Sequence, residues 1–173
     1  MKNIRIKRIA GENFKGFIKI AIDFTNVTRV FGRNATGKTT INDLFTWVMF
    51  NKDSKGVEKF NLRPLDKNGV QIDFVEIYGT VVLEVDGVEI SIEKTQKQNW
   101  VTKRGTATQE MQGNVNEFKW NSEPVAEKVY KEKISAIVGE DLFKQITNPM
   151  EFPGKKWQDQ RELLMKFAVG IKD

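Results

Sequence analysis

Alternating hydrophobic and polar residues at the start of the chain predict two strands ahead of any helix. Ile4 and Ile6 fall on one face of residues 2–10, with charged residues between them, which is typical of a strand with one solvated face. Glycines interrupt this pattern over residues 11–16, and the alternation resumes over residues 17–24. We therefore expect an antiparallel flap made of two paired strands.

A second β-rich region, in the middle of the chain, is organised around a tight turn. Residues 71–84 are rich in β-branched side chains, and Asp86-Gly87 then separates two alternating runs, which predicts a hairpin. Residues 95–113 are polar and predict a loose hairpin tip, with a returning strand at 114–120. Between the two β-rich regions, residues 51–69 are rich in Lys, Asn, Asp and Gly and predict a long, mobile loop.

Helical spacing dominates the last third of the chain. Ser122 is a plausible N-cap, with acidic and proline residues directly after it, and predicts a helix ending near Val138. A short helix is expected over residues 140–148 and a final helix over residues 155–168. The aromatic residues at helical spacing in these segments are interpreted as core.

The candidate chemistry lies between an apolar run at residues 27–31, which predicts a buried strand, and helical spacing at residues 41–48. The sequence that joins them, G-R-N-A-T-G-K-T, matches the Walker A pattern G-x-x-x-x-G-K-[ST] at every fixed position. Such a turn points successive N–H groups inward at the positive end of a helix and binds phosphate.

The residues of this loop have distinct expected roles. Gly32 and Gly37 allow backbone angles that other residues disfavour. Lys38 is expected to reach the β- and γ-phosphates, and the Thr39 hydroxyl to bind Mg²⁺. The nucleotide-binding residues predicted from the motif are Gly32, Arg33, Asn34, Ala35, Thr36, Gly37, Lys38, Thr39 and Thr40. The alternative to phosphate binding is a glycine turn that only caps the helix.

Composition narrows the chemistry further. The chain of 173 residues contains no cysteine and no histidine, which removes thiolate and imidazole metal ligands and favours a hard ion such as Mg²⁺ held by oxygen. The net charge of +5 favours a polyanionic partner, although a solvated lysine surface would give the same value. The N-terminus is no signal peptide and apolar runs are too short to cross a bilayer, so a cytoplasmic setting is expected.

The order of these motifs resembles the start of SMC-type ATPases. Residues 9–17, I-A-G-E-N-F-K-G-F, precede a second strand and then F-G-R-N-A-T-G-K-T-T-I. This resembles the heads of SbcC-like DNA-repair ATPases, RecF, RecN and phage relatives, which are ABC-type ATPases. In residues 141–171, F-K-Q-I-T-N-P and W-x-x-Q-R-E-L-L look like the segment that enters the family's coiled coil.

The resemblance implies an α/β fold, namely the N-terminal lobe of a P-loop NTPase with an antiparallel β flap and C-terminal helices leading toward a coiled coil. Residues 1–173 are expected to form one ATPase half-domain, because the family's Leu-Ser-Gly-Gly signature and Walker B Asp-Glu pair do not occur in this sequence. The implied cofactors are ATP and Mg²⁺, and the isolated chain is expected to lack ATP hydrolysis. The implied partners are its own C-terminal lobe, a second head in a homodimer, a nuclease subunit and DNA.

Residues outside the loop are assigned by the same resemblance. Lys15 matches the basic residue of the family's first turn, near the nucleotide, and a surface lysine is its alternative reading. Gln145 is the candidate for the family's Q-loop glutamine, which contacts Mg²⁺ and the attacking water. The alternative is an ordinary polar residue on a helix. Arg63, in the long loop at residues 51–69, is a further candidate for a cation near the nucleotide. Ala35 stands where the family often has glycine.

Two other functions stay open at this point. One is a different P-loop NTPase, of the transporter or kinase type, although the antiparallel flap and the coiled-coil lead-in argue against it. The other is a non-catalytic nucleic-acid-binding module that keeps the loop only as part of its fold. Titration with nucleotide distinguishes this module from the ATPase reading.

Overall fold

The computed structural model describes residues 2–102, 108–147 and 152–167, and it divides into two compact units. The first unit is Met1–Lys133 and the second is Ile134–Asp173. The Walker A loop and every strand belong to the first unit.

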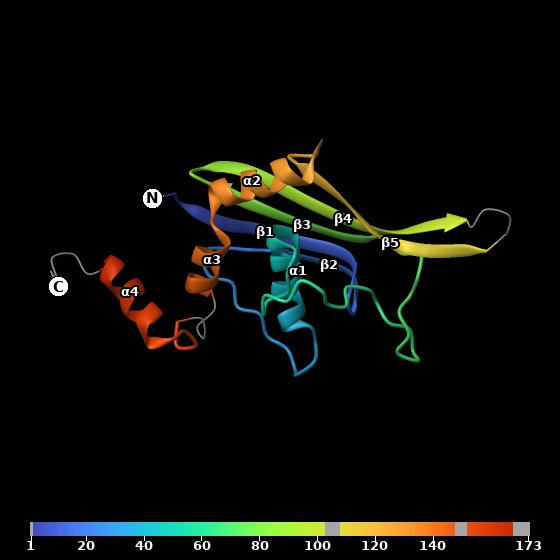
Figure 1. Ribbon diagram of the computed structural model, residues 1–173, viewed down its shortest axis with the longest axis horizontal. Helices are drawn as coiled ribbons and strands as arrows, with labels where there is room; N and C mark the ends of the chain where they lie inside the picture. The colour runs from blue at the N-terminus through green and yellow to red at the C-terminus, as the bar shows by residue number, and fades with distance from the viewer. Residues whose placement is uncertain (1, 103–107, 148–151, 168–173) are drawn as a thin grey trace. The chain divides into compact units, whose positions relative to one another are not determined.

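An antiparallel sheet of six strands is the largest element of the first unit (Figure 1). The strands are β1 (Ile4–Phe14), β2 (Phe17–Asp23), β3 (Ile77–Val85), β4 (Val88–Thr102), β5 (Gln109–Trp120) and β6 (Glu123–Val125). They lie in the order β2-β1-β3-β4-β5-β6, and every neighbouring pair is antiparallel. The predicted α/β fold with an antiparallel flap is therefore confirmed, and the flap is larger than the sequence indicated.

Four helices complete the described structure. They are α1 (Lys38–Phe50), α2 (Glu127–Ile137), α3 (Glu140–Thr147) and α4 (Trp157–Phe167). In the first unit, α1 packs on β1, β3 and β4. The α3 and α4 helices belong to the second unit and match the two helices predicted near the C-terminus. Within the described ranges, no helix combines the length and apolar character needed to cross a membrane.

The turn between β3 and β4 forms as its sequence predicts. Asp86 and Gly87 both have positive φ, 51° and 83°, and Val85 pairs directly with Val88. This is the geometry of a two-residue type I′ turn, whose twist matches that of the flanking strands. The hairpin then continues to Thr102, so the segment predicted as a loose tip is largely β-strand.

The predicted N-cap at Ser122 is wrong. Asn121 and Ser122 have φ of 51° and 67° and form a second two-residue turn, which pairs Trp120 with Glu123. The side-chain Oδ1 of Asn121 accepts a hydrogen bond from the backbone N–H of Ser91 at 2.9 Å. This long-range bond, together with the pairing of β6, makes the segment a strand, and α2 starts at Glu127 instead.

Two glycines allow α1 to approach the sheet closely. Gly11 and Gly79 are direct cross-strand partners on β1 and β3. A Cβ atom on Gly11 would lie 2.8 Å from Leu44 Cδ2, and one on Gly79 would lie 2.6 Å from Val48 Cγ2. Residues with a Cβ at these positions would therefore push the helix away from the sheet. The sequence predicted that the first strand is interrupted at Gly11, but β1 continues to Phe14, and Gly11 instead allows close packing of the helix.

The C-terminal end of α1 is fixed by groups from distant strands and helices. Lys94 on β4 is 1 % exposed and donates hydrogen bonds to the backbone oxygen of Trp47, at 3.2 Å, and to Asn51 Oδ1. Burial lowers the pKa of Lys94 to about 7. The hydroxyl of Tyr130 donates to the backbone oxygen of Val48 at 2.7 Å. The Val48 oxygen belongs to the last turn, where a helix leaves carbonyl groups unpaired, whereas the Trp47 oxygen also accepts from the backbone N–H of Asn51 at 3.0 Å.

The strand predicted before the Walker A loop does not form. Residues 24–33 have no regular secondary structure, and the apolar side chains of Val27 and Phe31 are 75 % and 85 % exposed. The apolar pattern predicted burial against neighbouring strands, but the six described strands pair with one another and none pairs with this segment. The loop is consequently positioned by α1 on its C-terminal side.

Substituting Gly79 by alanine tests the close packing of α1. We expect the added methyl group to lower the free energy of unfolding by about 1–3 kcal/mol, because Val48, Leu44 and Trp47 leave no room for it. Urea unfolding followed by circular dichroism measures this change. Gly139→Ala is the matched control, since its Cβ would meet nothing within 4 Å, and its effect should stay within about 0.5 kcal/mol. Equal stabilities of the two variants would contradict the packing argument.

Candidate phosphate-binding site

The Walker A loop ends at the first residue of α1. Gly37 is the N-cap of the helix and has φ 91°, in the left-handed region that glycine adopts freely. Ala35 has φ 63°, although it carries a Cβ that disfavours this conformation. Alternation between left-handed and other residues is the backbone pattern of an anion nest, in which successive N–H groups converge.

Internal hydrogen bonds close the loop on itself. Lys38 Nζ donates to the backbone oxygens of Gly32 and Arg33, each at 2.7 Å. The Thr36 hydroxyl donates to the same Arg33 oxygen at 2.8 Å. The lysine side chain thus lies over the loop and directs its charge to the centre of the loop.

The N-terminus of α1 is open to an anion. No side chain makes a capping hydrogen bond there, and the first backbone bond of the helix runs from Ile41 N to Gly37 O at 3.2 Å. The backbone N–H groups of the first turn therefore keep their capacity to bind an acceptor. The helix dipole adds positive potential at the same place.

A hollow of about 600 Å³ lies at this helix end. The residues that line it are Gly16, Phe17, Asn34, Ala35, Thr36, Gly37, Lys38, Thr39 and Thr40. The Phe17 ring packs against Gly37, where an added Cβ would lie 2.5 Å from Phe17 Cζ. Glycine is therefore required at this position both for its backbone angle and for contact with the wall of the hollow.

The donor set of the hollow fits a polyphosphate with Mg²⁺. Its lining offers hydroxyl groups and backbone N–H groups, and Lys38 is the one lysine or arginine among the described lining residues. Thr39 is the hydroxyl residue that directly follows Lys38, which is the Walker A position for a metal ligand. Among the described residues, no group of three or more Asp or Glu side chains suited to a metal ion is found.

Lys15 lies beside the loop and forms an ion pair. Its Nζ donates to Asp43 Oδ2 on α1 at 2.7 Å, and it lies 4.8 Å from the centroid of the Phe60 ring. Lys15 lines a neighbouring hollow of about 440 Å³ together with Gly16, Asn61, Arg63 and Leu65. Its predicted contact with the nucleotide stays a prediction.

Two further sequence candidates fall in different places. Arg63 is 5 % exposed, and its guanidinium donates to Val75 O at 3.1 Å and to Asn114 Oδ1 at 3.2 Å. These bonds fix the long loop to the sheet, and the part of Arg63 as a further cation near the nucleotide stays a prediction. Gln145 falls within α3, and its side chain lies outside the described residues.

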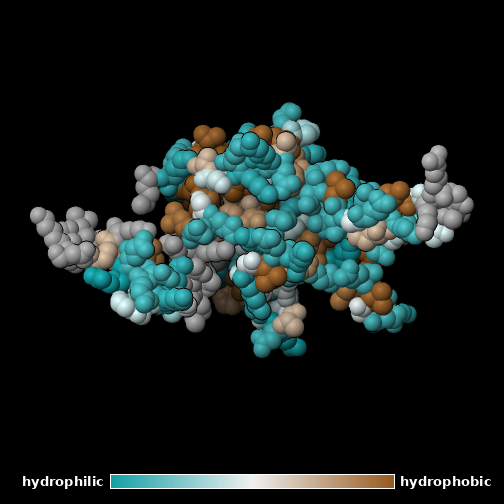
Figure 2. Space-filling model, viewed as in Figure 1, coloured by the Kyte–Doolittle hydropathy of each residue, from teal (hydrophilic) through white to brown (hydrophobic). Residues whose placement is uncertain are grey.

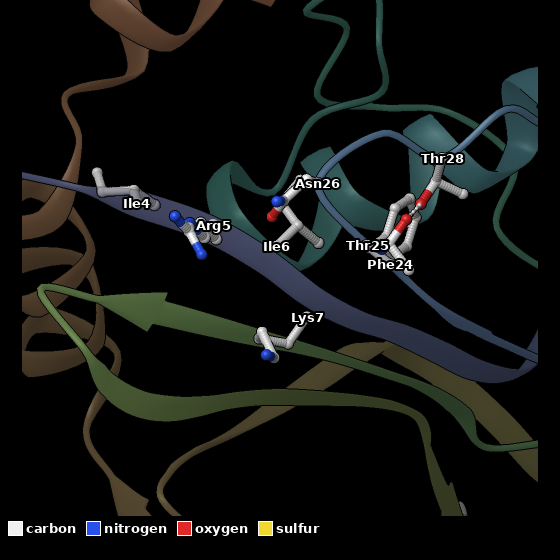
Figure 3. Close-up of a pocket in the computed structure, with 8 residues that line it drawn as sticks. All are labelled: Ile4, Arg5, Ile6, Lys7, Phe24, Thr25, Asn26 and Thr28. Atoms are coloured by element: carbon white, nitrogen blue, oxygen red, sulfur yellow. Dashed lines mark hydrogen bonds between the residues drawn. The ribbon is translucent and has the colours of Figure 1, made fainter.

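A third hollow, of about 510 Å³, borders the first half of β1 (Figure 3). Ile4, Arg5, Ile6 and Lys7 form one wall, and Phe24, Thr25, Asn26 and Thr28 from the segment after β2 form the other. Figure 3 shows Asn26 beside Ile6, while Lys7 points to the other side of the strand. This hollow contains no phosphate loop, so we assign it no part in nucleotide binding.

The sheet, α1 and the Walker A loop have the arrangement of a P-loop NTPase fold. The chain belongs to a family described as an AAA domain, whose model matches residues 8–167. No relative is found among curated protein sequences.

Solved structures with a similar fold include SMC and RecF proteins. One, titled "Structural biochemistry of ATP-driven dimerization and DNA stimulated activation of SMC ATPases", has a TM-score of 0.64 at 15% identity, covering 94% of this chain and 99% of that one. An Smc head domain from Pyrococcus yayanosii gives 0.57 at 16% identity, with 81% and 28% covered. A RecF–ATP structure gives 0.52 at 18% identity, with 78% and 31% covered. The chain thus spans less than a third of the last two.

Sequence reasoning missed the wall of the hollow opposite the loop. Gly16 and Phe17 were assigned only to a turn and a strand, and Asp43 was not singled out at all. The signal for Asp43 was a single acidic residue among the apolar residues of α1, where only Asp43 and Thr46 are buried and polar. The resemblance places the first turn of the flap near the nucleotide, but no pattern in the sequence identifies Gly16 and Phe17 as its lining residues.

Substituting Lys38 by alanine tests the phosphate site. We expect the affinity for Mg²⁺-ATP to fall roughly ten- to hundredfold, because charge-assisted hydrogen bonds to phosphate contribute about 1.5–3 kcal/mol. Isothermal titration calorimetry measures the change. Lys119→Ala, an exposed lysine of β5, removes the same charge elsewhere and should leave binding unaltered. Equal affinities of wild type and Lys38→Ala would exclude this site.

Proposed function

We propose that this chain binds Mg²⁺-ATP as the N-terminal lobe of an SMC/SbcC-like ATPase acting in DNA repair, recombination or phage DNA metabolism. The observation that carries the proposal is the loop itself, in which Lys38 Nζ is held over a glycine-rich nest at the open end of α1. Family membership and the fold of the SMC and RecF structures support it. The lobe would work in the cytoplasm.

In this proposal each part of the loop binds a different part of the ligand. The N–H groups of the nest and of the first helical turn donate to phosphate oxygens. Lys38 neutralises charge on the β- and γ-phosphates, and Thr39 orients its hydroxyl toward the metal. Thr39 would hold Mg²⁺ together with the ligand, and the ion would supply positive charge that offsets the negative charge of the phosphates.

Hydrolysis requires a group that these residues do not provide. The described lining of the hollow has no carboxylate and no histidine, so it offers neither of these side chains as a general base toward an attacking water. We propose that a C-terminal lobe with a Walker B glutamate and a second head with the signature motif supply it, as the resemblance implies. A nuclease subunit is a further expected partner.

An exposed apolar segment supports the docking of such a lobe. Val27, Val30 and Phe31, directly before the Walker A loop, are 75 %, 44 % and 85 % exposed, and Ile18 on the edge strand β2 is 81 % exposed. In Figure 2 hydrophobic residues reach the visible surface in separate patches among hydrophilic ones. Apolar surface beside a strand edge favours association, so this segment is the proposed contact for the strands of the second lobe.

A turnover assay tests the proposal. We expect the 173-residue chain to bind Mg²⁺-ATP without multiple turnovers, and the C-terminal lobe of its family, added as a separate chain, to restore phosphate release. Phosphate release measured with and without the added lobe, with Lys38→Ala as the control for contaminating ATPase, provides the test. Multiple turnovers by the chain alone that Lys38→Ala abolishes would refute the proposal that hydrolysis needs a C-terminal lobe. Absence of nucleotide binding would favour the non-catalytic nucleic-acid-binding module.

DNA contact by the long loop is the second part of the proposal. Lys55, Lys59 and Lys67 are exposed on residues 51–69, whereas Arg63 is buried and Lys52 pairs with Glu58 at 3.6 Å. The exposed cations can neutralise DNA phosphates and release counterions.

We expect weak DNA binding that falls steeply with added salt. Replacing Lys55, Lys59 and Lys67 together by glutamine should reduce both the affinity and the salt slope, with a loss of about one unit of slope for each phosphate contact removed. Fluorescence anisotropy with duplex and single-stranded oligonucleotides at several salt concentrations measures this. Affinity that does not respond to salt would disprove an electrostatic mode.

A further inference from the structure

A buried carboxylate lies directly behind the hollow, at a point where three segments meet. Asp43 on α1 is 6 % exposed, and its Oδ2 accepts a hydrogen bond from Lys15 Nζ at 2.7 Å. Its Oδ1 accepts from the backbone N–H of Ser54, at 2.9 Å, and from the Ser54 hydroxyl, at 2.6 Å. Burial alone would raise the pKa of Asp43, but the bonds from Lys15 and Ser54 outweigh it and hold the pKa below its usual value.

The two segments bound to Asp43 also contact each other. Lys15 occupies the turn between β1 and β2 with φ 51°, and its backbone N–H donates to Leu62 O at 2.7 Å. Its side chain extends past Phe60 before reaching the carboxylate. The turn is thus held at its backbone by the long loop and at its side chain by α1.

This turn carries one wall of the phosphate hollow. Gly16 and Phe17 directly follow Lys15 and line the hollow, and Phe17 rests on Gly37. Asp43 itself is not among the described residues that line it. An effect of Asp43 on a ligand in the hollow is therefore indirect, and its bond with Lys15 is the contact that links it to this wall.

We propose that Asp43 is a positioning residue for the nucleotide site, which fixes the Lys15-Gly16-Phe17 wall against the Walker A loop and anchors the 51–69 loop to the same point. The inference rests on the proposed nucleotide binding. It assigns Lys15 a structural contact in the free protein, in which its ammonium is engaged by Asp43.

The alternative is that Lys15 binds the nucleotide directly and Asp43 competes for it. The two readings predict opposite effects of removing the carboxylate. If Asp43 positions the wall, removing it weakens binding. If it holds Lys15 away from the phosphates, removing it frees a cation and strengthens binding.

Four variants separate these effects. Asp43→Asn keeps the shape of the side chain and an acceptor for Ser54 but cannot accept from Lys15. Lys15→Met removes the same contact from the other side, and Ser54→Ala removes only the hydroxyl bond to the loop. Glu12→Gln is the matched control, because it breaks a 2.8 Å ion pair, with Lys19, on the same hairpin. Glu12 directly follows Gly11, and its side chain lies on the face of the strand opposite to that on which Gly11 meets α1.

Binding of a non-hydrolysable Mg²⁺-ATP analogue, measured by calorimetry, is the first readout. We expect Asp43→Asn and Lys15→Met each to weaken binding roughly three- to thirtyfold, which is the range of coupling through a positioning contact. The double variant should lose no more than the weaker-binding single variant, because both remove one interaction. Lys15→Arg, which keeps the charge, should retain affinity, and Glu12→Gln should match wild type.

Hydrogen exchange followed by mass spectrometry on the nucleotide-free protein is the second readout. We expect Asp43→Asn to speed exchange in peptides covering residues 13–18 and 51–62, and Ser54→Ala to speed it only in the latter, with no change in either for Glu12→Gln. This measurement does not depend on nucleotide binding.

The outcomes are distinguishable. Unchanged or tighter analogue binding by Asp43→Asn, with normal binding by wild type, overturns the positioning role. Absence of binding by wild type overturns the proposed function, and the exchange data then decide the positioning role of Asp43. Equal exchange of Asp43→Asn and Glu12→Gln in both peptides overturns that role. A loss of affinity in the double variant that exceeds that of either single variant would show that Asp43 and Lys15 act independently, and it would overturn the inference as well.

Discussion

The close approach of α1 to the sheet is the constraint on which the phosphate site depends. Gly11 and Gly79 present no side chain beneath the helix, and Leu44 and Val48 fill the space that this leaves. The Walker A loop continues directly into α1, with no regular strand on its other side, so the position of the loop follows that of the helix. Lys94 and Tyr130 bind carbonyl groups at the far end, which holds the helix at both ends.

Local signals predicted those parts of the structure that local chemistry determines. The Walker A spacing located the loop, and Asp86-Gly87 located the hairpin, because each needs particular residues at neighbouring positions to reach positive φ. Ser122 shows the limit of this approach. Its sequence fits an N-cap, but the bonds between Asn121 and Ser91, thirty residues away, make the segment a turn. Such long-range pairing leaves no trace in a short window.

The apolar residues before the loop show what a hydrophobic pattern can establish. The pattern of residues 27–31 predicts a buried strand, but it does not specify which surface would cover the side chains, and Val27 and Phe31 are 75 % and 85 % exposed. Within the described sheet, β1 and β2 pair with each other and β1 pairs with β3, which leaves Val27 and Phe31 exposed. The predicted strand is therefore wrong, because the pairing of the six described strands offers it no partner.

The bonds within the loop explain how it keeps a phosphate-binding shape with alanine at position 35. A residue with a Cβ in the left-handed region costs about 1–2 kcal/mol, which is tolerated where surrounding contacts determine the conformation. Lys38 and Thr36 supply such contacts through the Gly32 and Arg33 oxygens. An ammonium group has three N–H donors, and two of those on Lys38 donate to these oxygens, so the third can bind a phosphate oxygen without breaking the loop. The same lysine can thus preorganise the nest and neutralise the ligand.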